Sequence, residues 1–399
     1  WNGIRKKFLL TFPNQNAMKL WEQYAEIRRQ SFQTYRDIRL ATEFYKKNRR
    51  AMDAGASVSW DKRFSPDAHE ISAVQHAMEW FIAKPGPFQS ELQNAPEDIS
   101  TPSKQWLKAP EIATKMHHLT QGIVPLGVRH LVAHVDVHDD LLYWVVVAYT
   151  PHGAGFVIDY GTYPDQKRRY FMKSQAKITM CRRHPKIGLA GAIATSLDAL
   201  LRDLLGRQWD TEQGNPMDIS LLGVDSGHNP KVCGRVLALL QKDRRFRNRL
   251  TLMKGFGVGP SDIPFAERKV KDGELLGNNW KQLPVPQGAA PQLHVDTNFW
   301  KTATNDRWAT GIGEPGALTL FYSRDHQLFS EHQTAEHATE TQGRGRTVFV
   351  FKLLPGRDNH WYDNLVACGV LGSVLHCDTP AALLDDGGTR PHVPEPPKL

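Results

Sequence analysis

Three strand-like runs follow one another in the middle of the chain, and they constrain its fold more than any other feature. The runs span residues 128–136, 141–150 and 155–160, and each places Val, Ile or aromatic residues among other apolar ones. Tight turns at 138–140 and 151–153 separate them. Short strands joined by tight turns pair antiparallel, so the sequence predicts a three-stranded meander.

After the meander, predicted helices and strands alternate. Apolar residues at helical spacing predict a helix over 187–205, and the short apolar run 219–224 predicts a buried strand. Such an alternation indicates an α/β fold with a mixed sheet flanked by helices, in which functional groups gather at strand ends. The remaining helices and strands are expected at 230–242, 250–253, 292–295, 317–322, 347–353 and 359–376.

The part before the meander reads as a helical connector. Residues 16–54 contain no Pro and repeat apolar residues close to helical spacing, and a second helix is expected at 68–82. Residues 92–127 are polar and interrupted by Pro, which is typical of a linker. We therefore expect three parts, which are a basic helical segment over 1–115, one large domain over 116–378, and a loose Pro/Gly-rich tail over 379–399.

Positive charge is concentrated at the start of the chain. The net charge is +8, and the first 50 residues hold 12 Lys and Arg against four acids, so the other 349 residues are neutral overall. A basic segment on a neutral body is typical of a protein with a polyanionic partner. A solvated helix face with local ion pairs explains the same charges equally well.

Several classes of protein are excluded by what the sequence lacks. The four Cys form no CxxC pair, so they are expected to be reduced thiols rather than a disulfide frame or a zinc site. The longest apolar run, 141–149, is far shorter than the roughly 20 residues of a membrane span. No signal peptide and no G-x-x-x-x-G-K-[ST] motif are visible in the sequence, so we expect neither secretion nor ATP binding by a P-loop.

Three acids are the candidate chemical groups. Asp136 and Asp225 each end a predicted strand, and Asp363 lies one turn into the last predicted helix. Converging carboxylates form a hard oxygen site that suits Mg²⁺ or Mn²⁺ better than zinc. Two such ions roughly 3.5–4 Å apart can activate water for phosphodiester hydrolysis without a protein nucleophile. Asp is also common at strand ends as a cap for backbone N–H groups, so the structural interpretation remains open.

Basic side chains supply the candidate DNA contacts. Residues 167–186 contain eight Lys and Arg and no acid, which favours sequence-independent phosphate contacts over a merely solvated loop. Lys301 lies close to Asp296 and is expected either to contact DNA or to form a local ion pair. The predicted DNA-binding residues are Lys167, Arg168, Arg169, Lys173, Arg182, Arg183, Lys254 and Lys301.

The order of these motifs resembles the large terminase subunit of tailed phages, in the lambda-like GpA family, and specifically its C-terminal nuclease region. Residues 134–138 (HVDVH) resemble the first nuclease strand, where the family often has Gln at the position of His138, and 223–227 (GVDSG) resemble the second acidic motif. The other segments that match in order are 41–60, 88–96 (FQSELQNAP, similar to F-x-x-E-x-Q-N-x-P), 254–255, 296–301 and 359–363 (NHWYD).

This resemblance implies an RNase H-like nuclease with two divalent metals, Mg²⁺ or Mn²⁺, held by Asp136, Asp225 and Asp363. It implies that the protein cuts concatemeric double-stranded viral DNA during packaging, in the bacterial host cytoplasm. The implied partners are double-stranded DNA, a packaging ATPase domain, the small terminase subunit and the portal. Since no ATPase motif is present, we expect the nuclease half of a larger motor or a relative that has lost the motor.

The leading hypothesis is therefore a divalent-metal-dependent endodeoxyribonuclease, a hydrolase. Two alternatives remain open. A non-catalytic module that docks DNA or a motor would bind DNA with a steep salt dependence but would not cleave it. Another RNase H-like enzyme, of the resolvase or integrase type, would prefer branched or end-processed DNA to linear duplex.

Overall fold

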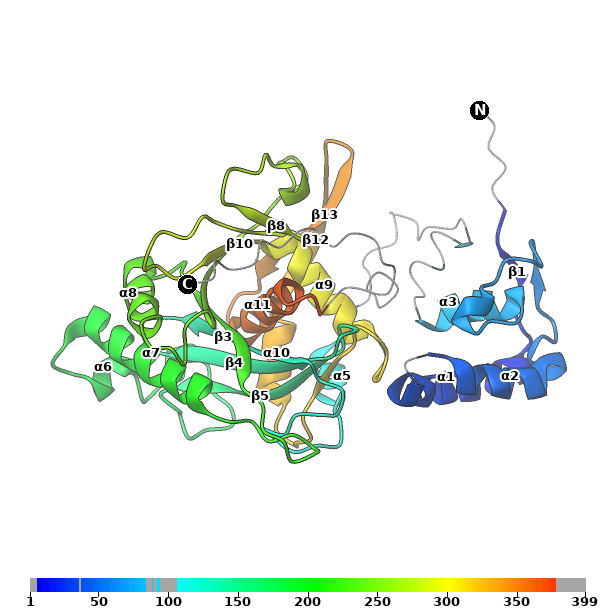
Figure 1. The fold of residues 1–399 in the computed structure, drawn as a ribbon, viewed down its shortest axis with the longest axis horizontal. Coiled ribbons are helices and arrows are strands. Elements are labelled where there is room, and N and C mark those ends of the chain that lie inside the picture. The colour runs from blue at the N-terminus through cyan, green and yellow to red at the C-terminus, as the bar shows by residue number, and fades with distance from the viewer. Residues whose placement is uncertain (1–5, 36, 84–87, 89–91, 94–105, 378–399) are drawn as a thin grey trace. The chain divides into compact units, whose positions relative to one another are not determined.

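The computed structural model describes residues 6–35, 37–83, 88, 92–93 and 106–377 (Figure 1). The chain divides into two compact units. The smaller consists of Trp1–Gln105 with Thr310–Glu314, and the larger of Trp106–Ala309 with Pro315–Leu399. The expected tail at 379–399 and most of the stretch 88–96 lie outside the described residues.

The smaller unit is mainly helical, with a small two-stranded sheet. Its aromatic core includes Trp21, Tyr24 and Tyr45, which are all buried. The expected helical region 16–54 forms two helices, and the Asp37 carboxylate accepts the backbone N–H of Arg39 at 3.0 Å, which starts the second helix afresh. The elements are β1 (Leu9–Thr11), α1 (Gln15–Tyr35), α2 (Arg39–Met52), β2 (Ser57–Val58), η1 (Pro66–Ala68) and α3 (Ala73–Ala83).

The larger unit is built on a nine-stranded sheet with the order β11-β5-β4-β3-β6-β7-β10-β9-β8. Its first three strands form the predicted antiparallel meander, and β6, β7 and β10 then add parallel to one another on the β3 side. The strands are β3 (His130–Val137), β4 (Leu142–Tyr149), β5 (Gly155–Tyr163), β6 (Ile219–Asp225), β7 (Leu250–Phe256), β8 (Leu275–Gly277), β9 (Trp280–Gln282), β10 (Gln292–Asp296) and β11 (Leu318–Leu320). The predicted α/β fold, an RNase H-like mixed sheet flanked by helices, is confirmed.

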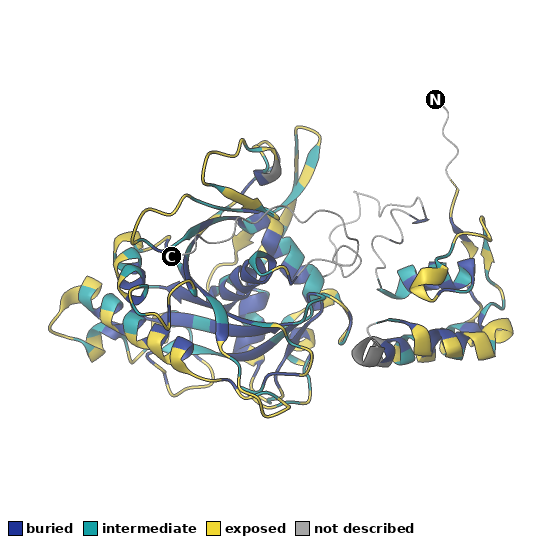
Figure 2. Ribbon diagram, viewed as in Figure 1, coloured by how far each residue is buried: buried dark blue, intermediate teal, exposed yellow. Residues whose placement is uncertain are grey.

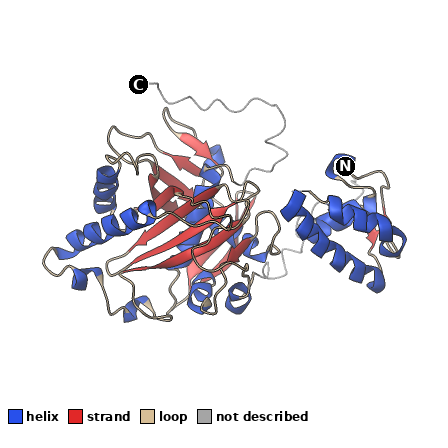
Figure 3. Cartoon of the chain, turned by 60° about the horizontal axis from the view of Figure 1, so that its bottom comes forward, coloured by secondary structure: helices blue, strands red, loops and turns tan. Residues whose placement is uncertain are grey.

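Helices cover both faces of this sheet (Figure 3). Along β3, Leu131 and Val135 pack into the core beneath α7 (Gly188–Gly206) and α8 (Pro230–Leu240), whereas Val132 packs into the core with α9 (Thr297–Ala309) and α11 (His360–Val374). Side chains alternate along a strand, so Asp136 shares the α11 face with Val132. The central strands are consequently buried almost throughout (Figure 2).

Some elements of the larger unit were not predicted. The supposed linker contains α5 (Ala109–Ala113), which packs against α10 (Gln327–Gln333). The predicted strand at 347–353 is present as β13 (Arg346–Leu353), and it pairs with β12 (Glu336–Gly343) in a separate hairpin. The short helices η3 (Lys173–Gln175), α6 (Met180–Arg183) and η4 (Phe265–Glu267) complete the unit. No described helix is long and apolar enough to cross a membrane.

Candidate metal and nuclease site

Asp136, Asp225 and Asp363 line one cavity of about 380 Å³. Asp136 and Asp225 lie at the carboxyl ends of β3 and β6, and these strands are parallel neighbours whose ends meet at one edge of the sheet. Asp363 comes from the first turn of α11, which covers that face. The other lining residues are His134, Gly227, Met253, Lys254, Gly255, Gly257, Val295, Thr297, Lys301, Val366 and Ala367.

Asp136 is the most firmly held of the three acids. Its Oδ2 atom lies 2.7 Å from His138 Nε2 and 3.1 Å from His360 Nδ1. Burial favours the neutral acid, but the two histidines outweigh it and hold the pKa of Asp136 below its ordinary value. Asp136, His138 and His360 each offer one ligand atom, and these three atoms lie within 4.8 Å of one another.

Asp225 has much less compensation for its charge. Burial, followed by the negative charge of Asp136, raises its pKa to about 6. Both of its carboxylate oxygens accept the backbone N–H of Gly227, at 3.1 and 3.2 Å. The negative charges of Asp136 and Asp225 repel each other in the same cavity. A bound cation would therefore stabilise the charged forms of both carboxylates.

Asp363 is supported by a small polar network. Its Oδ1 lies 2.9 Å from Lys301 Nζ and its Oδ2 accepts Asn359 Nδ2 at 2.8 Å, while Glu336 Oε1 accepts from both donors, at 2.5 and 2.6 Å. Burial raises the pKa of Asp363 to about 6 although Lys301 lowers it, and the charges of Glu336 and Asp136 raise it further. The Asp363 side chain is 40% exposed because it opens into the cavity, yet protein atoms surround it closely enough for burial to dominate.

The two cavity lysines differ in their environment. Lys254 is exposed, and its Nζ lies 5.5 Å from the centroid of the Phe256 ring. Lys301 is only 9% exposed and is paired with Asp363 and Glu336, so the geometry favours an ion pair over contact with DNA. The predicted ion pair between Lys301 and Asp296 is wrong. The Asp296 carboxylate instead accepts backbone N–H groups at the start of α9.

The basic loop residues do not line the cavity. Lys167, Arg169 and Arg182 are exposed, and the first two form ion pairs with Asp165 at 2.7 Å and Asp325 at 3.1 Å. Arg168 is also exposed, and the Arg183 guanidinium lies 5.1 Å from the centroid of the Tyr163 ring.

Lys173, which is half-buried, is hydrogen-bonded to the segment that leads into α11. Its backbone N–H donates to Asp358 at 2.6 Å, and its charge opposes that of protonated His138.

Three residues of this site were not found from the sequence. His360 precedes Asp363 by three positions, and residues three apart share a helix face, so its spacing was a usable signal. Asn359 is the N-cap residue that directly precedes the same helix. Glu336 stands in a polar, half-exposed strand, where nothing in the local pattern marks it as a partner of Lys301.

Comparison with known proteins bears on residues 101–381. A family model described as "Terminase large subunit gpA, endonuclease domain" matches this range. The match includes the whole nine-stranded sheet and every residue of the cavity. No curated protein and no solved structure matches the chain.

Proposed function

Because the chain belongs to the terminase large subunit gpA endonuclease family, we propose that it is a divalent-metal-dependent endodeoxyribonuclease that cuts concatemeric double-stranded DNA by two-metal hydrolysis. The observation that carries this proposal is the cavity that Asp136, Asp225 and Asp363 line together. The proposed setting is viral genome packaging in the bacterial host cytoplasm, with a packaging ATPase domain, the small terminase subunit and the portal as partners.

The residues of the cavity fit a hard divalent cation. Its acidic donors are carboxylate oxygens, and two of the three acids have a raised pKa, to which the charges of the other acids contribute. Asp136, Asp225 and Asp363 would hold Mg²⁺ or Mn²⁺. Such ions lower the pKa of a bound water and stabilise charge on the scissile phosphate when present.

The chain's own residues account for the rest of the site. Lys254, which is exposed and lines the cavity, would contact a DNA phosphate. Lys301 holds Asp363 in place. Ser226 is not a nucleophile, since its buried hydroxyl donates to the carbonyl of Met253 at 2.9 Å.

Cleavage of supercoiled plasmid in Mn²⁺ tests the proposal. We expect Asp225→Asn to lower the cleavage rate at least about 100-fold, because it removes a charged ligand. Asp198→Asn is the matched control, since Asp198 pairs with Arg202 one turn further along α7, outside the cavity, and it should cut at the parental rate. Equal cutting by Asp225→Asn and the parent would refute the assignment.

The same assay separates the alternative functions. DNA binding with a steep salt dependence but no metal-dependent cutting by the parent would indicate a docking module. Faster cutting of branched DNA than of linear duplex would indicate a resolvase-like enzyme.

A further inference from the structure

Two histidines meet at one oxygen of the most buried acid in the site. His138 Nε2 and His360 Nδ1 lie 2.7 and 3.1 Å from the same atom, Asp136 Oδ2. The two rings are close to each other, with centroids 4.1 Å apart. Among the described residues, no hydrogen bond is found to the other oxygen, Oδ1, so one side of the carboxylate faces nitrogen donors and the other does not.

The proton on His360 distinguishes a hydrogen bond from a ligand position. A neutral imidazole carries one N–H. If it is on Nδ1, His360 donates to Asp136, but Nε2 is left buried, and it has no hydrogen-bond partner in the part of the chain that the structure describes. If it is on Nε2, the N–H points to Asp358 Oδ1 at 3.8 Å, and the bare Nδ1 faces the Asp136 oxygen. Two facing lone pairs repel each other, so a cation, either a proton or a metal ion, must lie between them.

Asp358 lies where it can support the arrangement in which His360 carries its proton on Nε2. Its Oδ2 accepts the backbone N–H of Lys173 at 2.6 Å, which fixes the carboxylate beside His360. Tyr143 lies against the His360 ring, with centroids 4.4 Å apart, and fixes its plane. A histidine that binds a metal with one nitrogen commonly directs its other N–H to a carboxylate, which sets its tautomer and orientation.

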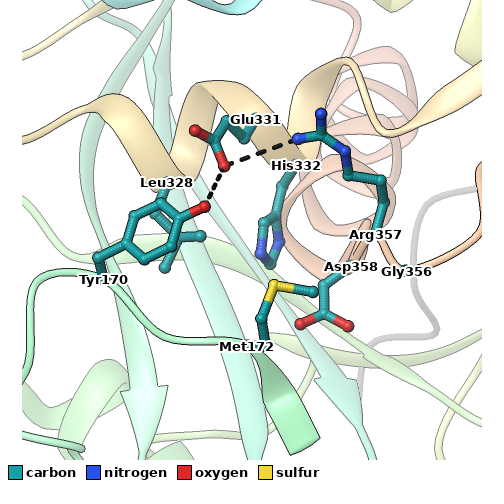
Figure 4. Close-up of a pocket in the computed structure, with 8 residues that line it drawn as sticks. All are labelled: Tyr170, Met172, Leu328, Glu331, His332, Gly356, Arg357 and Asp358. Atoms are coloured by element: carbon teal, nitrogen blue, oxygen red, sulfur yellow. Dashed lines mark hydrogen bonds and ion pairs between the residues drawn. The ribbon is translucent and has the colours of Figure 1, made fainter. Parts of the chain in front are cut away.

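A second cavity, of about 330 Å³, is lined by Asp358 (Figure 4). Figure 4 shows Asp358 and His332 beside Met172, with Glu331 joined to Tyr170 and Arg357. Asp358 therefore borders open space on one side and His360 on the other.

We propose that Asp136, His138 and His360 form a cation position with two nitrogen ligands, supported by Asp358. This inference rests on the proposed function for its role in cleavage. Asp225 and Asp363 line the same cavity as Asp136 and offer oxygen ligands only. Imidazole is a poor ligand for Mg²⁺ and a better one for first-row transition ions, among which Mn²⁺ binds most weakly, so a position with two imidazoles should bind Mn²⁺ in preference to Mg²⁺.

Pulsed EPR of Mn²⁺ bound to the full chain tests this directly, because a coordinated imidazole couples its ¹⁴N nucleus to the manganese electron spin. We expect ¹⁴N coupling in the parent and a weaker or lost coupling in His138→Ala and His360→Ala. The matched control is His130→Gln, a half-buried histidine at the other end of β3 that bonds Ser220 at 3.1 Å and should leave the spectrum unchanged.

Asp358→Asn tests the supporting role separately. It should weaken Mn²⁺ affinity about 10- to 100-fold while the ¹⁴N coupling remains in saturated samples. Unchanged affinity in this variant would overturn the role of Asp358, and Mn²⁺ bound with no ¹⁴N coupling in the parent would overturn the whole inference.

Failure of this inference is distinguishable from failure of the proposed function. If the parent cuts plasmid but its Mn²⁺ shows no nitrogen coupling, the nuclease stands and the histidines only orient Asp136. If nitrogen coupling is present but the parent does not cut, the metal position stands and the nuclease proposal falls.

Discussion

Single residues in this protein show how strongly a buried charge depends on its partners. Lys301 is almost buried, and it compensates both Glu336 and Asp363. Removal of one member of such a group leaves the others as uncompensated buried charges, which costs more than the group itself contributes.

We predict that Lys301→Met lowers the free energy of unfolding by about 3 kcal/mol at pH 7.5, because two carboxylates lose their cation. Urea unfolding followed by fluorescence measures this change. Lys254→Met is the matched control, since it alters a lysine of the same cavity that is exposed, and we expect a change of less than about 0.5 kcal/mol. Equal effects of the two substitutions would contradict the buried ion-pair role.

His332 makes stability depend on pH. Burial lowers the pKa of this 2% exposed histidine to about 3, so it stays neutral in the folded protein while the unfolded chain binds a proton below about pH 6.5. Its contribution is therefore complete above the unfolded pKa and falls as the pH drops, by about 2 kcal/mol between pH 7 and pH 5. His332→Asn keeps an acceptor for the backbone N–H of Trp361. This variant should lose the part of the pH dependence of urea unfolding that comes from His332. An unchanged slope in this variant would show that His332 titrates normally.

At the scale of elements, the pattern of apolar residues correctly predicted the helices and strands that pack against apolar neighbours. It did not predict elements whose buried face contains polar side chains. The meander, β6 and α7 follow simple periodicity, and the structure has them within a few residues of the expected bounds. Helix α9 was missed because it buries Asn298, Lys301, Thr304 and Asn305, which removes the apolar stripe.

The candidate site followed the same rule. Its acids were predictable because they end strands or begin a helix, and the structure brings all three to one cavity. Their histidine and lysine partners come from across the fold, and pairing between distant segments leaves no local pattern. Strand β12, with Glu336, alternates exposed and half-exposed residues and gives no apolar signal.

Strands β6 and β7 pack closely beside the cavity, which Met253 of β7 lines. A Cβ atom on Gly223 would lie 2.4 Å from Met253 Sδ and 3.0 Å from His134 Cδ2. We predict that Gly223→Ala destabilises the protein by about 1–3 kcal/mol through overpacking. In Gly234→Ala on α8 the new Cβ meets nothing within 4 Å, so that variant should be stabilised by up to about 1 kcal/mol. Thermal unfolding compares the two, and a neutral Gly223→Ala would contradict the packing argument.

At the scale of the whole molecule, the first 50 residues carry a net charge of +8, and α2 lies mostly within this segment. Lys46, Lys47 and Arg50 are exposed on α2 and near one another in sequence. If they bind DNA phosphates, replacing all three by Gln should reduce the slope of log K against log salt by about 0.9 for each phosphate that is no longer bound. Fluorescence anisotropy with a duplex at several salt concentrations measures the slope, and an unchanged value would favour the solvated helix face.

The three acids of the cavity come from β3, β6 and α11, and the last of these is the final helix that the structure describes. A chain still emerging from the ribosome, or one cut between these elements and separated, holds at most part of the set. If these acids are the ligand set of the proposed nuclease, DNA cleavage requires that all three elements have folded together.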